Sequence, residues 1–314
     1  MSLIMTCLQI GLVFGLMSLG IFISFKILDT PDLTVDGSFT LGASISAILC
    51  VNDVPIFGPT LGLLIAIIGG AIAGIITGIL HTKLKIQVVL SGILTMTGLY
   101  SINFWITGRR PSIILYGHET IFSIFEKLKD KQIIGTSLRD ICILLLIILI
   151  ACITILILNY FFKTNLGMAI RATGDNEAMV RSSSINTDTM KIIAFALANS
   201  LVSLGGALFV QLQGNYDNSY GTGMMVIGLA AIIIGEAIFK HKKQIKIGKS
   251  FIIVIIGAII YQFIYMIALL IDGVDPIDIK ILTAIIIVLS VCIPRLINYI
   301  KKIRGRKGIS NARH

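Results

Sequence analysis

The sequence predicts an all-α fold, a polytopic membrane helix bundle of about nine transmembrane helices. Of its 314 residues, 56% are hydrophobic and 13% are charged, and the mean hydropathy is +0.96. A soluble domain carries about 25% charged residues. Uncharged apolar stretches longer than about 18 residues recur along the chain, and each can cross a hydrocarbon core roughly 30 Å thick as a helix. These observations exclude soluble enzyme folds, secreted disulfide scaffolds and disordered chains.

Apolar runs and the polar breaks between them predict the positions of the helices. In chain order the expected spans are 3–25, 37–51, 57–80, 86–107, 139–162, 189–211, 222–239, 250–271 and 279–298. Glycines recur at four-residue spacing in two of them: Gly11 and Gly15 in the first, and Gly70, Gly74 and Gly78 in the third. Such spacing clears one face of a helix for close packing against another backbone, and therefore indicates a bundle.

The charge distribution predicts the orientation. The chain has 26 Lys and Arg against 16 Asp and Glu, a net charge of +10. Nine spans place the termini on opposite sides, and a cytoplasmic tail puts most of the basic residues in inside segments, as the positive-inside rule requires. We therefore expect a membrane protein with its N-terminus outside and its C-terminus in the cytoplasm. We expect residues 1–300 to form the transmembrane domain in the lipid bilayer and 301–314 to form a basic cytoplasmic tail. The positive-inside bias explains the net positive charge, so no nucleic-acid partner is expected.

No catalytic or metal-binding constellation is visible. The cysteines are odd in number and lie within or beside apolar spans, which is typical of small hydrophobic residues: Cys7, Cys50, Cys142, Cys152 and Cys292. Gly248, Lys249 and Ser250 resemble the end of a phosphate-binding loop, but Lys243 occupies the position that requires glycine, and no strand precedes it. We expect no metal, no cofactor and no enzymatic activity in this chain.

The segment before the second span is unusually polar. Residues 29–38 hold three carboxylates, a proline and a glycine beside apolar helix. Irregular backbone is tolerated at membrane depth only where protein buries it or where it lines a cavity, and transporters place solute contacts there. The alternative is a solvated cytoplasmic turn in which Ser38 or Asp36 caps the following helix.

A second polar interruption, at 211–221, is expected on the opposite side of the membrane. Two glycine-containing polar segments in corresponding positions of the two halves suggest an inverted repeat around a central pathway. The candidate pathway residues are Asp32, Thr34, Asp36, Gly37, Ser38, Gln211, Gln213, Asn215 and Asn218. Glu236 is the one acid expected inside a span. It is either a functional intramembrane group or the partner of Lys240 in an i, i+4 pair at the helix end.

The cytoplasmic loop at 163–190 is the most informative stretch. Its 167–182 portion is typical of a short amphipathic helix pair broken at Gly174. Small and apolar side chains on this pair suit docking into a groove of another protein: Met168, Ala172, Ala178 and Met179. A helix lying on the membrane surface is the alternative, although it would be richer in Lys, Trp and Phe.

At this point the sequence resembles a known family. The run 167–185 (GMAIRATGDNEAMVRSSSI), followed by a span with Gly205 and Gly206, is similar to the coupling loop of permease subunits in the branched-chain amino acid and ribose family of bacterial ABC importers. Residues 32–38 (DLTVDGS) resemble an acidic stretch of the ribose permeases. Within the family, 33–39 and 80–86 (LHTKLKI) most resemble permeases paired with lipoprotein receptors for aromatic amino acids. The likeness covers about 5–295, with one N-terminal helix fewer than the ten-helix ribose permeases.

The resemblance implies a role and a set of partners. It implies a permease for an amino acid, aromatic or branched-chain, that works with a second permease subunit, an extracytoplasmic substrate-binding lipoprotein and a cytoplasmic ATPase dimer that holds ATP and Mg²⁺. The residues expected to couple to the ATPase are Gly167, Ala169, Arg171, Ala172, Gly174, Asp175, Asn176, Ala178, Arg181 and Ile185. Three alternatives stay open: an importer of a sugar or nucleoside, an ion-driven secondary transporter, and a membrane enzyme or assembly factor.

Overall fold

The structure is a computed structural model, and it describes residues 2–52, 58–123, 125, 136–239, 247–270 and the single positions 281, 284 and 288. In chain order its elements are α1 (Ser2–Phe22), the π-helix η1 (Ile23–Ile27), α2 (Thr34–Val51), α3 (Gly58–Thr82), α4 (Val88–Ile106), β1 (Ser112–Ile114), α6 (Thr136–Phe161), α7 (Asn165–Asp175), α8 (Glu177–Ser182), α9 (Thr187–Gln213), β2 (Asn215–Asp217), α10 (Met224–Phe239) and α11 (Ile247–Leu269).

These elements confirm the predicted helical membrane bundle. Seven helices of the described part are long and apolar enough to cross a membrane, and α10 is a shorter apolar helix. Each matches a predicted span to within a few residues. The ninth predicted span, 279–298, lies almost wholly outside the described residues, as does the basic tail at 301–314.

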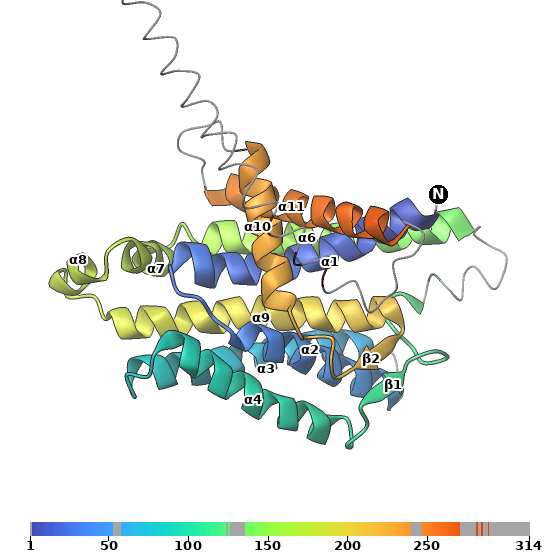
Figure 1. The fold of residues 1–314 in the computed structure, drawn as a ribbon, viewed down its shortest axis with the longest axis horizontal. Helices are drawn as coiled ribbons and strands as arrows, with labels where there is room; N and C mark the ends of the chain where they lie inside the picture. Colours follow the sequence, from blue (N-terminus) through green and yellow to red (C-terminus); the bar gives the residue numbers. More distant parts are fainter. Residues whose placement is uncertain are drawn as a thin grey trace, which may run out of the picture.

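Three helices form the centre of the bundle. In Figure 1, α9 runs through the middle, with α1, α6 and α11 on one side and α2, α3 and α4 on the other. Most spanning residues of α1, α2 and α9 are buried, whereas about a third or fewer are buried in α3, α4, α6 and α11. The outer helices expose large apolar side chains, such as Leu156 and Ile157 of α6. A bilayer covers such a surface, because lipid tails are as apolar as these side chains.

Glycines set the closest helix contacts, as their spacing predicts. A Cβ at Gly70 of α3 would overlap the carbonyl oxygen of Asn199 in α9, and one at Gly74 would overlap that of Phe195. The glycines of α1 likewise pack against α11, where Gly11 meets the backbone of Ile259. Larger residues at these positions would force the paired helices apart.

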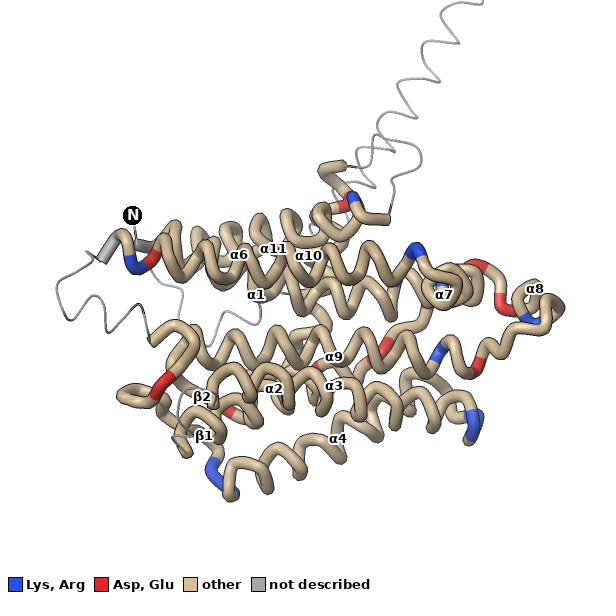
Figure 2. The backbone as a smooth tube through the Cα atoms, turned by 180° about the vertical axis from the view of Figure 1, so that it is seen from behind, with Lys and Arg blue, Asp and Glu red and all other residues tan. Residues whose placement is uncertain are grey.

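The two ends of the bundle differ. The helical pair α7 and α8 projects at one end, and the small sheet lies at the other (Figure 1). In that sheet β1 pairs antiparallel with β2, with Ser112 opposite Asp217, so the loops after α4 and after α9 lie on one side. Figure 2 shows the charged residues gathered mostly towards these two ends, with uncharged helix between them. This pattern is expected of helices that cross a membrane.

The polar segment before α2 lies at the mid-length of the bundle. Ser38 in the second turn of α2 donates a 2.7 Å hydrogen bond to Asn199, which lies near the middle of the 27-residue helix α9. Asp32, just before α2, is 1% exposed. The solvated-turn alternative therefore does not hold for Asp32 and Thr34, which are buried, although Asp29 at the start of the linker is exposed.

The second interrupted helix, α10, begins beside the first turn of α2. After β2 the chain turns back, and α10 then runs steeply across the other helices (Figure 1). Gly221 in the returning segment packs so tightly on α2 that a Cβ would overlap the carbonyl oxygen of Asp36. Two helices that start within the bundle thus meet at their N-terminal ends. The inverted repeat that the two polar breaks in the sequence suggest stays a prediction.

Candidate functional site

A buried polar cluster lies where α2, α3, α4 and α9 meet. Asn199 of α9 donates from Nδ2 to Oδ2 of Asp32 at 2.7 Å, and its Oδ1 accepts the bond from Ser38. The other Asp32 oxygen accepts from the backbone N–H of Thr34 at 2.9 Å. In the described part of the chain no Lys, Arg or His forms an ion pair with Asp32. Neutral donors alone solvate this carboxylate.

Threonine hydroxyls extend the cluster to the outer helices. Thr34 Oγ1 lies 2.7 Å from Thr77 Oγ1 of α3, and Thr77 donates to Thr95 Oγ1 of α4 at 3.0 Å. Asp32, Thr34 and Ser38, which the sequence suggests as pathway residues, are therefore satisfied by protein groups. Their hydrogen bonds hold the start of α2 against α3, α4 and α9, since a buried polar network keeps its members in one arrangement when every group has a partner.

Asp36 joins the two helix starts. Its Oδ2 accepts from the backbone N–H of Gly223 at 2.9 Å, and its Oδ1 accepts from Met225 N–H at 2.8 Å. These donors belong to the first turn of α10, where N–H groups lack partners within the helix and the helix dipole favours a negative charge. A side chain of α2 thus caps α10, whereas the sequence alternative had Asp36 capping its own helix.

The predicted polar residues at the end of α9 and just after it divide into two groups. Gln211 donates to Ser46 Oγ and Pro59 O and accepts from Ile121 N–H, all within 3.0 Å, so it ties three segments together. Asn215 accepts from the hydroxyl of Tyr220. These two predicted pathway residues are fixed by their neighbours, while Gln213 and Asn218 line cavities.

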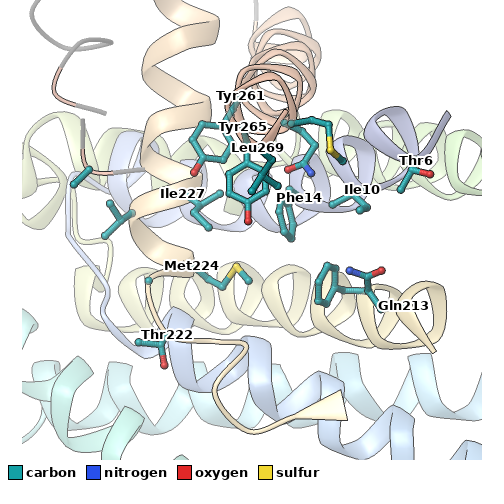
Figure 3. A pocket seen from close by; sticks show the side chains of 16 residues that line it. Thr6, Ile10, Phe14, Gln213, Thr222, Met224, Ile227, Tyr261, Tyr265 and Leu269 are labelled. Carbon is teal, nitrogen blue, oxygen red and sulfur yellow. The ribbon is translucent and has the colours of Figure 1, made fainter. Parts of the chain in front are cut away.

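A cavity of about 710 Å³ lies between α1, α9, α10 and α11. Its walls are mostly aromatic and aliphatic, with a few polar groups, among them Thr6, Gln213 and Gln262. Figure 3 shows side chains of α1 and α11 above this space and those of α9 below it. Tyr261, Gln262 and Tyr265 of α11 were not predicted. The sequence signal was two phenols and an amide in an otherwise apolar stretch.

A second, smaller cavity of about 180 Å³ lies on the other side of the segment before α10. Thr222 lines both cavities, so this segment separates them. The smaller cavity is lined by the predicted residues Asp36, Gly37 and Asn218, together with Met96, Tyr100 and Asn103 of α4, which sequence reasoning missed.

At the opposite end, α7 and α8 form the predicted helix pair, but the break is at a different residue. The sequence places it at Gly174; the structure places Gly174 within α7 and the break at Asn176, whose backbone is extended (φ −158°, ψ 95°). Asn176 Oδ1 accepts from Met179 N–H and so begins α8. The structure requires glycine at 174 for packing and not for a break: Gly174 lies against η1, where a Cβ would overlap the Ile27 carbonyl oxygen.

The predicted coupling residues lie on two faces of this pair. Gly167 is buried against the end of α6, and Ala169 and Gly174 are half-buried. Seven predicted residues are exposed: Arg171, Ala172, Asp175, Asn176, Ala178, Arg181 and Ile185. Met168 and Met179, which the sequence suggests for docking, share this exposure, as does Leu166, which was not predicted. The pair therefore presents an apolar surface at a charged end of the bundle.

An ion-pair network anchors α8 to the first turns of α9. Glu177 contacts Lys191 at 2.8 Å and Arg181 at 2.9 Å, and Arg181 also contacts Asp188 at 3.1 Å. The hydrogen bond from Lys191 is the main reason that the pKa of Glu177 lies below its ordinary value; the charge of Lys191 and the hydrogen bond from Thr187 also lower it. Arg181 thus has partners within the chain.

Glu236 pairs across the fold. Its carboxylate lies 3.1 Å from the ammonium of Lys26, at the end of η1. The expected partner, Lys240, lies outside the described residues. Among the described residues no group of three His, Cys, Asp or Glu could hold a metal ion.

Comparisons with known proteins identify the family. A sequence profile described as branched-chain amino acid transport system / permease component matches residues 3–291. The chain is 38% identical over 288 residues to the tyrosine transport system permease protein of Clostridioides difficile (strain R20291), covering 92% of this chain and 90% of that protein. It is 32% identical over 291 residues to the uncharacterized protein RP368 of Rickettsia prowazekii (strain Madrid E), covering 92% and 97%.

A more distant likeness is to a sugar permease. The chain is 26% identical over 234 residues to the ribose import permease protein RbsC of Haemophilus influenzae, covering 74% of this chain and 67% of that protein. No solved structure matches. The family profile and the relatives span nearly the whole of the described bundle. This multi-pass membrane protein therefore belongs to the family of permease components of branched-chain amino acid transport systems.

Proposed function

We propose that this chain is the permease subunit of an ATP-driven, binding-protein-dependent importer for an amino acid with an aromatic or branched side chain. Two copies of the chain would form the pathway, and a cytoplasmic ATPase dimer would bind and hydrolyse ATP with Mg²⁺. An extracytoplasmic lipoprotein would select the solute. The tyrosine permease relative supports the amino-acid substrate, and the family profile supports the permease role.

The observation that carries this proposal is the α7–α8 pair. It presents exposed Met168 and Met179 at one end of the bundle, and ion pairs fix its other face to α9. An apolar helical surface of this kind suits docking into a groove of a partner protein. Because α8 is ion-paired to α9 and Gly174 of α7 packs against η1, movement of a docked ATPase would be transmitted to the bundle and not absorbed by a flexible loop.

The contact of α7 with η1 would carry a movement of α7 to the segment before α2. Gly174 packs on the backbone of Ile27, and a short linker leads from there to Asp32 and to Asp36, which caps α10. A displacement of α7 would therefore pull on the segment that joins the two interrupted helices. Switching between outward and inward openings needs such a bistable element between two packings.

The larger cavity suits the proposed solute class. Phe14, Phe209, Tyr261 and Tyr265 supply aromatic wall, and Gln213 and Gln262 supply amides. Binding sites for amino acids with large side chains combine an apolar wall with a few placed polar groups. A sugar would need polar partners around most of its ring, and this wall offers few. We therefore favour an amino acid over a sugar or nucleoside.

The test is solute uptake by the reconstituted complex. Permease, ATPase and receptor are placed in sealed vesicles, and entry of labelled L-tyrosine, L-leucine and D-ribose is measured with and without ATP. Uptake of one or both amino acids that needs both ATP and receptor would support the proposal. Uptake driven by an ion gradient without ATP would replace it with a secondary transporter, and uptake of ribose alone would replace the substrate class.

A surface cross-linking experiment tests the partner contact separately. A cysteine at Met179 should form a cross-link to the ATPase, whereas one at Leu156, exposed on α6, should not. Equal cross-linking at both positions would contradict the assignment of the α7–α8 surface.

A further inference from the structure

We propose that the smaller cavity binds the zwitterionic headgroup of an α-amino acid, with Asp36 and Asn103 facing its ammonium group and Asn218 facing its carboxylate. The inference rests on the proposed function, since it takes the transported solute to be an amino acid. It adds a site of recognition within the permease itself.

The first observation is a pair of unsatisfied amides. Asn103 is 1% exposed; its Nδ2 donates to the Gly37 carbonyl oxygen at 3.4 Å, which leaves Oδ1 without a partner. Asn218 is 8% exposed; its Oδ1 accepts from the hydroxyl of Tyr216 at 2.9 Å, which leaves Nδ2 without a partner. A buried polar atom that has no partner destabilises the structure, so a ligand that pairs with it gains from doing so. Both residues line the same cavity.

The second observation is a charge. The Asp36 carboxylate lines this cavity, and only backbone N–H groups bond to it in the described part of the chain. A carboxylate accepts up to about four hydrogen bonds, so each oxygen has capacity left for a ligand. The walls thus combine a negative charge and a free acceptor, Asn103 Oδ1, with a free donor, Asn218 Nδ2.

This combination selects among ligand classes. A metal cation or an amine would use the acceptors and leave the donor at Asn218 unsatisfied. An anion would use that donor but would face the charge of Asp36. A sugar would use both but would gain no charge-assisted bond. A zwitterion matches all three groups, with its ammonium on the acceptors and its carboxylate on the donor.

Size and surroundings agree with a headgroup. A volume of about 180 Å³ exceeds the roughly 30 Å³ that one water occupies, yet it is below the roughly 300 Å³ at which pockets for whole drug-sized ligands begin. The volume is large enough for a headgroup, and Met96 and Tyr100 line the same cavity.

The test uses cysteine protection in the purified complex of permease, ATPase and receptor. In a cysteine-free background, Thr97→Cys places a thiol at the cavity wall, and its alkylation rate by N-ethylmaleimide is measured. L-Tyrosine and L-leucine should each slow the reaction about tenfold at ten times their dissociation constant. Tyramine, 3-(4-hydroxyphenyl)propionate and D-ribose should not. Ser101→Cys, exposed on α4 outside the cavity, is the matched control whose rate no probe should change.

An isosteric variant sharpens the test. Asn218→Asp keeps the acceptor for Tyr216 and replaces the free donor by an acceptor, so it should lose protection by L-tyrosine and gain protection by tyramine. Protection of the unaltered cavity by tyramine as strong as that by L-tyrosine would overturn the proposal in favour of a cation site. If the complex takes up L-tyrosine with ATP but no amino acid protects Thr97→Cys, the headgroup site is wrong and the proposed function stands.

Discussion

Asn199 of α9 and Asp32 of the linker before α2 are joined by a 2.7 Å hydrogen bond between fully buried side chains that lie 167 positions apart in the sequence. In the described structure the Asp32 carboxylate accepts two hydrogen bonds. One comes from the nearby backbone of Thr34, and the other, from Asn199, comes from a different helix. It therefore links the interrupted start of α2 to the central helix.

Breaking this pair should destabilise the bundle. Asn199→Leu leaves a buried carboxylate short of one donor, at a cost of about 1 to 3 kcal/mol. We expect a lower melting temperature of the purified protein in detergent. Asn199→Asp should do the same at neutral pH because two carboxylates would then face each other, and adding Asp32→Asn should restore the bond with its direction reversed. A double variant no more stable than Asn199→Asp alone would contradict this account.

The two small residues of the α7–α8 pair should respond differently to enlargement. Gly174→Leu forces a side chain into the Ile27 backbone, so it should lower the melting temperature and loosen α7. Ala178→Leu adds the same side chain at an exposed position and should leave the melting temperature unchanged while weakening ATPase binding in a pull-down. Equal melting temperatures for the two variants would show that Gly174 is not a packing contact.

The anchor of α8 should weaken in acid. Because Glu177 has a folded-state pKa below its ordinary value, its ion pairs stabilise the structure above that ordinary value, about pH 4, and the stabilisation is lost as the pH falls through the folded pKa. Hydrogen exchange at 177–191, corrected for intrinsic rate, should therefore quicken below about pH 4. Glu177→Gln should remove most of this pH dependence, whereas Asp175→Asn, at an exposed site nearby, should leave it unchanged.

The orientation has a direct test at the two ends of the bundle. In a cysteine-free background, Ser219→Cys lies exposed at the end that holds β2, and Ser183→Cys lies exposed just after α8. With the N-terminus outside, an impermeant thiol reagent should label the first in intact cells and label the second only after the membrane is opened. The reverse pattern would invert the proposed topology.

Asp36 should matter more for transport than for folding. Asp36→Ala removes a helix cap worth about 1 kcal/mol and frees the start of α10. We expect lower uptake by the reconstituted complex with no change in the affinity of the receptor for solute. Asp36→Asn keeps acceptor capacity for one backbone N–H and should retain more uptake. Full uptake by the alanine variant would show that the link between α2 and α10 is not needed for the transport cycle.

The membrane class, the positions of the spans in the described part and the faces on which the helices pack closely could all be predicted from the amino-acid sequence. It could do so because backbone groups in lipid must bond within their own helix, so length and hydropathy are enough to locate a span. The glycine faces follow from the same local rule, since four-residue spacing always clears one side of a helix. The local pattern predicts a helical pair at 167–182 broken at Gly174; the structure has the pair at 165–182 with the break at Asn176.

Which polar groups meet could not be predicted from the sequence and is seen in the folded bundle. Asp32 with Asn199, Asp36 with the start of α10, Gly174 with Ile27 and Glu236 with Lys26 are all contacts between segments far apart in the chain. Most spans are apolar on every face, so periodicity does not reveal which side turns inward or how deep a neighbour lies. The rotation of each helix and its depth in the membrane are fixed by the packing of the complete bundle. This packing gives the Asp32 carboxylate hydrogen-bond partners within the protein, whereas Asp36 lines a cavity.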